Sequence, residues 1–251
     1  VENYTDRYTG MMLINPYVYT SGGVKFLGHF DGTNGATAFV DSSGNNVTIT
    51  TVGTAQLSTS IKKFGTASLY LPANTAYTTI PSTVANFAGK DFCIELWVYP
   101  ITKGGFGNII GHNLASTSFV GFNLQWTFYG DFIKFLSGYQ GAGIWTLDAT
   151  STVVVALNVW THIAITRQGQ VLRVFINGVK VIEFNSASTL WAESNSGYFG
   201  IGAGDGNNRF GVGYIDEVRI VEGAAIYTSN FTPPTSPLKK KKKMTTSNST
   251  N

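Results

Sequence analysis

The chain has 251 residues, a formal net charge of +3 and 12% charged residues, against roughly 25% in average globular proteins. Hydrophobic residues make up 43% and aromatic residues 14%, so the chain can bury a sizeable core and global disorder is excluded. The only cysteine, Cys93, excludes a disulfide framework and a cysteine-based zinc site. No apolar stretch approaches the roughly 18 residues of a transmembrane helix, so we expect no membrane span.

The basic net charge comes from one short segment. Five of the 17 basic residues form the run Lys239–Lys243, and the remaining 12 face 14 acidic residues. Such a run binds any polyanion weakly, but no aromatic residues are interleaved with it to stack on bases. We therefore expect a solvated, disordered tail and no specific nucleic-acid partner.

Short strands are expected in succession after a turn-rich arm at residues 1–23. Phe92–Tyr99 alternates apolar residues on one face, and Pro100 is expected to end that strand. Asn177-Gly178 between two apolar runs is typical of a type I′ hairpin, and Glu222–Tyr227 could form at most a helical turn. The other expected strands are 24–30, 46–52, 67–71, 108–111, 119–129, 132–136, 144–147, 160–166, 171–176, 179–184, 198–201 and 214–220.

About a dozen short strands with frequent turns predict an all-β, antiparallel sandwich or barrel. Three prolines between Pro233 and Pro237 are expected to end the domain, because proline gives no ladder donor. The predicted organisation is an arm at 1–23, a domain at 24–237 and a flexible basic tail at 238–251.

Several segments resemble the motifs of laminin-G-like domains, in the order that this family has. They are His29–Gly35 (HFDGTNG), Lys63–Leu71 (KFGTASLYL), Asp91–Pro100 (DFCIELWVYP), Trp160–Ala164 (WTHIA), Val174–Gly178 (VFING) and Tyr214–Ile220 (YIDEVRI). Each motif is weak alone, whereas the ordered set is specific. The resemblance implies a concanavalin A-like jelly roll of two antiparallel sheets.

The closing segment Tyr227–Pro234 (YTSNFTPP) resembles a subset of these domains found in bacteriophage structural proteins. This resemblance implies a virion protein, assembled in the bacterial cytoplasm, that decorates the particle or adheres to host-surface glycans. We expect the arm to contact other virion proteins and the assembly to be homo-oligomeric. The alternative is a secreted or cell-surface bacterial carbohydrate-binding module, which the lack of a signal-peptide pattern at the N-terminus disfavours.

Catalytic groups are not clustered in the sequence. Glycosidases with this fold use paired carboxylates, which must alternate along a strand to share a face. Asp216 and Glu217 are adjacent, and Glu95 stands alone between Ile94 and Leu96. We therefore expect no enzymatic activity, with a glycoside hydrolase as the less favoured alternative.

Calcium is the one candidate cofactor, because oxygen-rich loops supply the ligands that this ion prefers. The candidate ligands are Asp31, Asp41, Asn45, Asn46 and Asp216. The competing interpretation is that Asp and Asn favour turns by bonding their own backbone. Asp216 could also pair with Arg219 or cap a loop.

Aromatic residues in the middle of the chain are candidates for glycan binding, because rings stack on the apolar faces of sugars. They are Trp126, Tyr129, Tyr139 and Trp145. The competing interpretation places these rings in the core, since each large ring buries about 150–250 Å². For Trp97 and Trp160, which sit in strong strand motifs, we expect core positions.

Overall fold

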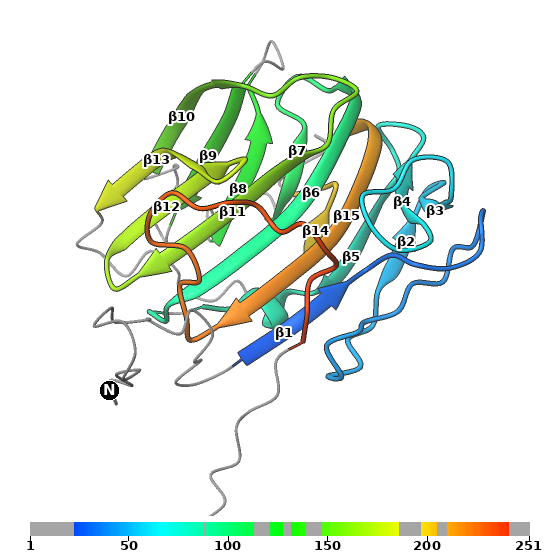
Figure 1. Cartoon of the computed structure of the whole chain (residues 1–251), viewed down its shortest axis with the longest axis horizontal. Coiled ribbons are helices and arrows are strands. Elements are labelled where there is room, and N and C mark those ends of the chain that lie inside the picture. Colours follow the sequence, from blue (N-terminus) through cyan, green and yellow to red (C-terminus); the bar gives the residue numbers. More distant parts are fainter. Residues whose placement is uncertain are drawn as a thin grey trace, which may run out of the picture.

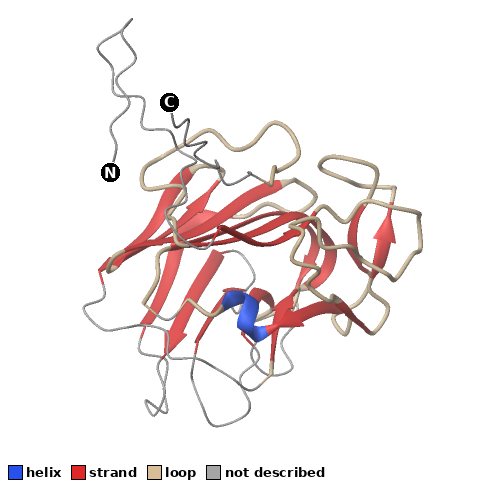
Figure 2. Cartoon of the chain, turned by 90° about the horizontal axis from the view of Figure 1, so that it is seen from below, coloured by secondary structure: helices blue, strands red, loops and turns tan. Residues whose placement is uncertain are grey.

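The computed structural model describes residues 23–87, 89–112, 121–127, 132–138, 147–185, 197–204 and 210–240. These residues form two packed antiparallel sheets, seen edge-on in Figure 2. The fold prediction of an all-β two-sheet sandwich is confirmed. The described part of the chain contains no helix with the length and apolar character needed to cross a membrane.

The eight-stranded sheet contains the strands that carry most of the family-like motifs (Figure 1). Its order is β13 (Val179–Asn185), β12 (Val171–Ile176), β11 (Thr161–Gln168), β6 (Phe92–Lys103), β15 (Gly211–Glu222), β4 (Ser68–Leu71) and β3 (Gln56–Ser58). The first strand, β1 (Gly23–Gly28), pairs with β15 outside this path.

The seven-stranded sheet lies behind the first. Its order is β10 (Leu147–Val154), β9 (Phe132–Gly138), β8 (Gly121–Trp126), β7 (Asn108–His112), β14 (Tyr198–Ile201), β5 (Tyr77–Pro81) and β2 (Thr50–Val52). A single 3₁₀ turn, η1 (Ser82–Ala85), follows β5 in the described chain.

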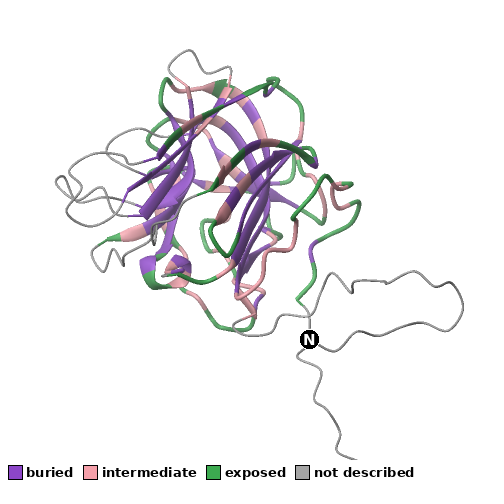
Figure 3. Ribbon diagram, turned by 90° about the vertical axis from the view of Figure 1, so that its left-hand side faces the viewer, coloured by how far each residue is buried: buried purple, intermediate pink, exposed green. Residues whose placement is uncertain are grey.

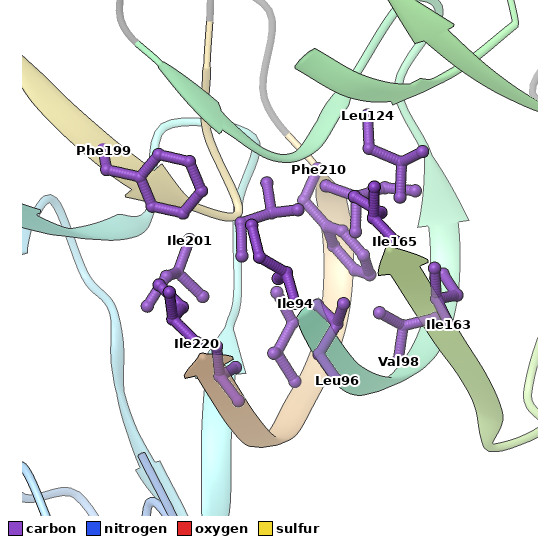
Figure 4. Close-up of a cluster of buried hydrophobic side chains, with 14 of the residues drawn as sticks. Ile94, Leu96, Val98, Leu124, Ile163, Ile165, Phe199, Ile201, Phe210 and Ile220 are labelled. Carbon is purple, nitrogen blue, oxygen red and sulfur yellow. The ribbon is translucent and has the colours of Figure 1, made fainter. Parts of the chain in front are cut away.

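The core lies between the sheets, where buried residues face each other (Figure 3). Alternate residues of β6 supply Ile94, Leu96 and Val98, which are fully buried, as the alternation predicted. They meet side chains from the opposite sheet, including Leu124 and Phe199 (Figure 4). Because successive residues alternate in direction, the residues between them point away from the core, onto what we call the outer face.

Pro100 does not end β6, contrary to the sequence prediction. The strand continues to Lys103 because the neighbouring strand β15 shifts register between Val212 and Gly213. A Cβ on Gly213 would collide with the Tyr99 carbonyl, so only glycine permits this close approach. Pro100 still contributes a bond, because its carbonyl accepts the Asn158 N–H at 2.8 Å.

Several other boundaries differ from the prediction. Strands β3 and β5 were missed, and the strand expected at 144–147 is observed as Leu147–Val154. Residues Glu222–Tyr227 form no helical turn. Leu238, which was assigned to the tail, is only 6% exposed, so the packed chain extends past the prolines.

Residues 223–240 form a segment that we call the C-terminal strap, which crosses the outer face of the eight-stranded sheet (Figure 1). The rings of Tyr227 and Phe231 stack at 3.6 Å and cover His162 and Phe175. The Phe231 N–H binds the Gly178 carbonyl. The strap is therefore an integral part of the fold.

The Asn177-Gly178 hairpin is confirmed, with φ of 49° and 79°. A Cβ on Gly178 would collide with the Phe231 carbonyl, whereas a Cβ on Gly169, another hairpin glycine with positive φ, meets open space. We expect Gly169→Ala to cost about 1 kcal/mol from backbone strain alone. Gly178→Ala should cost about 2–4 kcal/mol, because strain and overpacking add. Urea unfolding of both variants checks this, and equal losses would contradict the role of the strap contact.

Candidate ligand-binding surface

Two of the predicted calcium ligands hold the same loop, residues 63–67. The Asp216 carboxylate accepts the N–H groups of Lys63 at 2.8 Å and Phe64 at 3.2 Å. Asp31 Oδ1 accepts the N–H groups of Thr66 and Ala67. The two aspartates thus act as clamps on the loop backbone.

Burial raises the pKa of Asp216 to about 7. The backbone N–H groups of Lys63 and Phe64 favour its charged form and oppose this rise, and the nearby charge of Glu217 adds to it. Asp216 does not pair with Arg219, contrary to the alternative raised from the sequence.

The other predicted ligands organise the 41–46 loop beside β1. Asp41 accepts the N–H groups of Leu27 and Val47. The Asn45 amide donates to the Val24 carbonyl at 2.8 Å, and Asn46 adopts a positive φ of 55°. Asp41 also accepts the Ser43 N–H two residues on at 2.9 Å, as expected of a turn-forming aspartate, whereas Asn45 reaches across to β1.

The five residues do not gather into one calcium cage. Asp31 and Asp216 bind the 63–67 loop, whereas Asp41 and Asn45 lie in the 41–46 loop and bind β1. Within the described residues, no group of three or more His, Cys, Asp and Glu side chains could hold a metal. The observed donor set does not fit a shared calcium site, and calcium binding stays a prediction.

A buried charged network lies on the outer face beneath the strap. Glu95 is fully buried, and its Oε1 accepts two N–H groups of Arg219. Its Oε2 lies 3.2 Å from His162 Nε2 and accepts the Tyr227 hydroxyl at 2.9 Å. Burial alone would raise the pKa of Glu95, but the Arg219 charge and the His162 hydrogen bond outweigh it and lower the pKa to about 2.

Sequence reasoning treated Glu95 as isolated and missed this network. Its partners lie 67, 124 and 132 residues away along the chain. The single signal was a charged residue inside an apolar strand. Because both oxygens of Glu95 are engaged and the group is buried, the network serves to attach the strap.

Of the four aromatic residues predicted to bind glycans, the structure describes Trp126, and the prediction is wrong for this residue. Trp126 is fully buried, and its indole N–H donates to the Phe210 carbonyl at 2.8 Å. Trp126 is therefore a core residue, as the competing interpretation held. Tyr129, Tyr139 and Trp145 lie outside the described residues.

A different set of rings forms a row across the outer face of the eight-stranded sheet. Tyr70, Tyr214 and Tyr99 are direct partners on β4, β15 and β6. The centroids of Tyr70 and Tyr214 are 4.6 Å apart, and those of Tyr214 and Tyr99 are 6.0 Å apart. Trp160 extends the row, with its ring 5.5 Å from Tyr99. We call these four residues the aromatic row.

The aromatic row remains partly open to solvent. Tyr70, Tyr99 and Trp160 are half-buried, and Tyr214 is 6% exposed. Tyr99 lies four residues beyond Glu95 along β6, past the point where Tyr227 of the strap binds. Trp160 was expected in the core, but it lies on this outer row.

The comparisons with known proteins agree with this architecture. The family model described as "Concanavalin A-like lectin/glucanases superfamily" (Laminin_G_3) matches residues 72–225, more than half of the chain. The chain belongs to this superfamily. The laminin-G-like resemblance is thereby confirmed, and a comparison with curated proteins finds no match.

Solved structures with a fold similar to this chain include a domain of an arabinanase and two binding domains. Domain 4 of AbnA, a GH43 extracellular arabinanase from Geobacillus stearothermophilus solved with arabinotriose, has a TM-score of 0.60 and 20% identity, over 81% of this chain and 94% of that domain. The binding domain of Paraclostridial Mosquitocidal Protein 1 has a TM-score of 0.62 and 15% identity, over 80% of this chain. The binding domain of Botulinum neurotoxin DC in complex with SialylT has a TM-score of 0.54 and 14% identity, over 79% of this chain. This chain spans 49% of the mosquitocidal protein chain and 48% of the neurotoxin chain.

Proposed function

We propose that this superfamily member is a non-enzymatic glycan-binding domain. The observation that carries the proposal is the aromatic row, which places the half-buried rings of Tyr70, Tyr99 and Trp160 around the buried Tyr214 on the outer sheet face. Sugar rings present apolar C–H faces, and aromatic rings with polar tips suit ligands that are partly apolar and partly wet. Similar domains solved with arabinotriose and with SialylT support this choice of ligand class.

The positions of the carboxylates support a binding role over a catalytic one. A glycosidase needs two carboxylates flanking a sugar bond. In the described chain, Glu95 is enclosed under the strap and Asp216 clamps the 63–67 loop. Neither carboxylate is free to act on a ligand lying over the aromatic row.

The proposal is tested by screening the purified chain on a glycan array and measuring hits by calorimetry. We expect Tyr99→Ala and Trp160→Ala to weaken binding about 5- to 150-fold, the range for losing a stacking ring worth roughly 1–3 kcal/mol. Tyr198→Ala is the matched control, because Tyr198 is a half-buried ring on the other sheet. Binding lost in the control but kept in the row variants would overturn the site. Repeating the titrations in the presence of a chelator tests whether binding needs calcium.

We propose a phage particle as the setting of this domain, as a decoration, fibre or tail component. The motif resemblance of Tyr227–Pro234 supports this, although Tyr227 and Phe231 also have a packing role in the strap. Mass spectrometry of purified virions should detect the chain, and its absence from particles would contradict the proposal.

The alternative setting is a secreted or cell-surface carbohydrate-binding module. The likeness to a domain of an extracellular arabinanase favours it. Detection of the chain in culture medium or on cell surfaces, without phage particles, would support this alternative.

A further inference from the structure

The loop at residues 62–65 borders the aromatic row and carries two lysines. Trp97 and Tyr99 are two residues apart on β6 and point to the same outer face. The Lys63 Nζ lies 3.8 Å from the centroid of the Trp97 ring, a cation–π contact. Lys62 is exposed next to it, and its Nζ donates to the Thr59 carbonyl. Positive charge therefore lies over Trp97, one outward position along β6 from Tyr99 of the row.

Two carboxylates hold the backbone of this loop by hydrogen bonds. Asp216 binds the N–H groups of Lys63 and Phe64, and Asp31 binds those of Thr66 and Ala67. These carboxylates hold the loop backbone in place, and Asp216 also lies close enough to Lys63 to interact with its charge. The loop is thus preorganised, which lowers the entropic cost of binding.

Trp97 carries an unsatisfied hydrogen-bond donor at the same place. The residue is 5% exposed, and its Nε1–H has no hydrogen-bond partner in the part of the chain that the structure describes. A buried donor without an acceptor is energetically unfavourable. The donor is itself buried, so an oxygen atom of a bound ligand satisfies it only after neighbouring side chains, such as Lys63 over the ring, shift.

We propose that the ligand of the aromatic row is an acidic glycan, whose carboxylate binds Lys63 while its sugar rings lie along Tyr99 and Trp160. This inference rests on the proposed glycan-binding function. The lysines supply the charge complementarity, the row supplies the stacking surface, and the Trp97 N–H supplies a donor for a ligand oxygen. Lys63 then determines specificity for acidic over neutral sugars.

The test compares 3′-sialyllactose and oligogalacturonate with lactose and a neutral galactose oligomer by calorimetry on the full chain. We expect the acidic probes to bind at least about tenfold tighter, as hydrogen bonds to charged groups are worth roughly 1.5–3 kcal/mol. Lys63→Gln should remove that preference, measured as the ratio of acidic-probe to neutral-probe affinity within the same variant. Lys90→Gln is the matched control, since Lys90 is an exposed lysine paired with Glu222, which lies beside Phe92 at the far end of β6.

Trp97→Phe tests the donor separately, because it keeps an aromatic ring and removes the N–H. Circular dichroism melting verifies that each variant is folded. We expect weaker binding of the acidic probe to Trp97→Phe, and unchanged affinity would remove Trp97 from the site. Neutral probes binding as tightly as acidic ones, or Lys63→Gln without effect, would overturn the acidic-glycan inference and leave the proposed function standing. Failure of every glycan to bind would overturn both.

Discussion

Arg219→Ala is expected to destabilise the fold by about 3–5 kcal/mol, the cost of leaving a buried charge without its partner. Arg219 donates two hydrogen bonds to Glu95 and a third to the Lys239 carbonyl at 3.2 Å. The variant leaves the fully buried Glu95 with only His162 and Tyr227. Guanidinium unfolding monitored by fluorescence measures the loss.

Arg173→Ala is the matched control for that prediction. Arg173 also pairs with a glutamate, Glu183, at 3.0 Å, but this partner lies in solvent and is shared with Lys180. Solvent screening makes exposed pairs weak, so we expect a much smaller loss. Similar losses in the two variants would show that the Glu95 network does not anchor the C-terminal strap.

The unfolding free energy of the native chain is expected to fall relative to that of His112→Phe as the pH drops from 6.5 to 4. This residue is buried at the end of β7 between Phe122 and Phe199, and its Nδ1 accepts the Phe122 N–H. Burial lowers the pKa of His112 to about 4, and a hydrogen bond with the Ala85 backbone opposes this only in part. The imidazole therefore stays neutral in the folded state over this range.

The sign follows from proton uptake. Below pH 6.5 the unfolded chain protonates His112 and the folded chain does not, so stability is present above the unfolded pKa and is lost as the pH falls. At 1.36 kcal/mol per pH unit, the full contribution is about 3 kcal/mol. Asp216 has a raised pKa and acts in the opposite direction, but it is common to both proteins in a comparison with His112→Phe.

The measurement is urea unfolding of the native chain and His112→Phe at pH 7.5 and pH 5. We expect the native chain to lose about 2 kcal/mol more than the variant on acidification. Equal losses would mean that His112 is accessible to protons in the folded state.

The fold was predictable from the sequence because strand alternation and turn chemistry are local signals. Ile94, Leu96 and Val98 recur with period two, and Asn177-Gly178 marks a hairpin without any tertiary information. The continuation of β6 through Pro100 was not predictable, because it depends on Gly213 in a strand more than a hundred residues away. Leu238 was missed for a similar reason, since its N–H binds Glu217 at a bulge of β15.

The aromatic row was harder to predict than the core. Tyr70, Tyr99 and Tyr214 each occupy an outward position of a strand, and only the strand register brings them together. A sequence shows that a ring points away from the core, but it does not show which strands are neighbours. Asp41 illustrates the converse, because its preference for turns was a local signal and its contact with the Ser43 N–H follows it.

The central claim is that the aromatic row binds glycans, and calorimetry of Trp160→Ala against the native chain tests it most directly. The glycan is the best array hit of the native chain, and Tyr198→Ala is titrated in parallel. The account predicts weaker binding by at least about fivefold in Trp160→Ala, with an unchanged melting temperature and native affinity in Tyr198→Ala. Native affinity in folded Trp160→Ala would contradict the account.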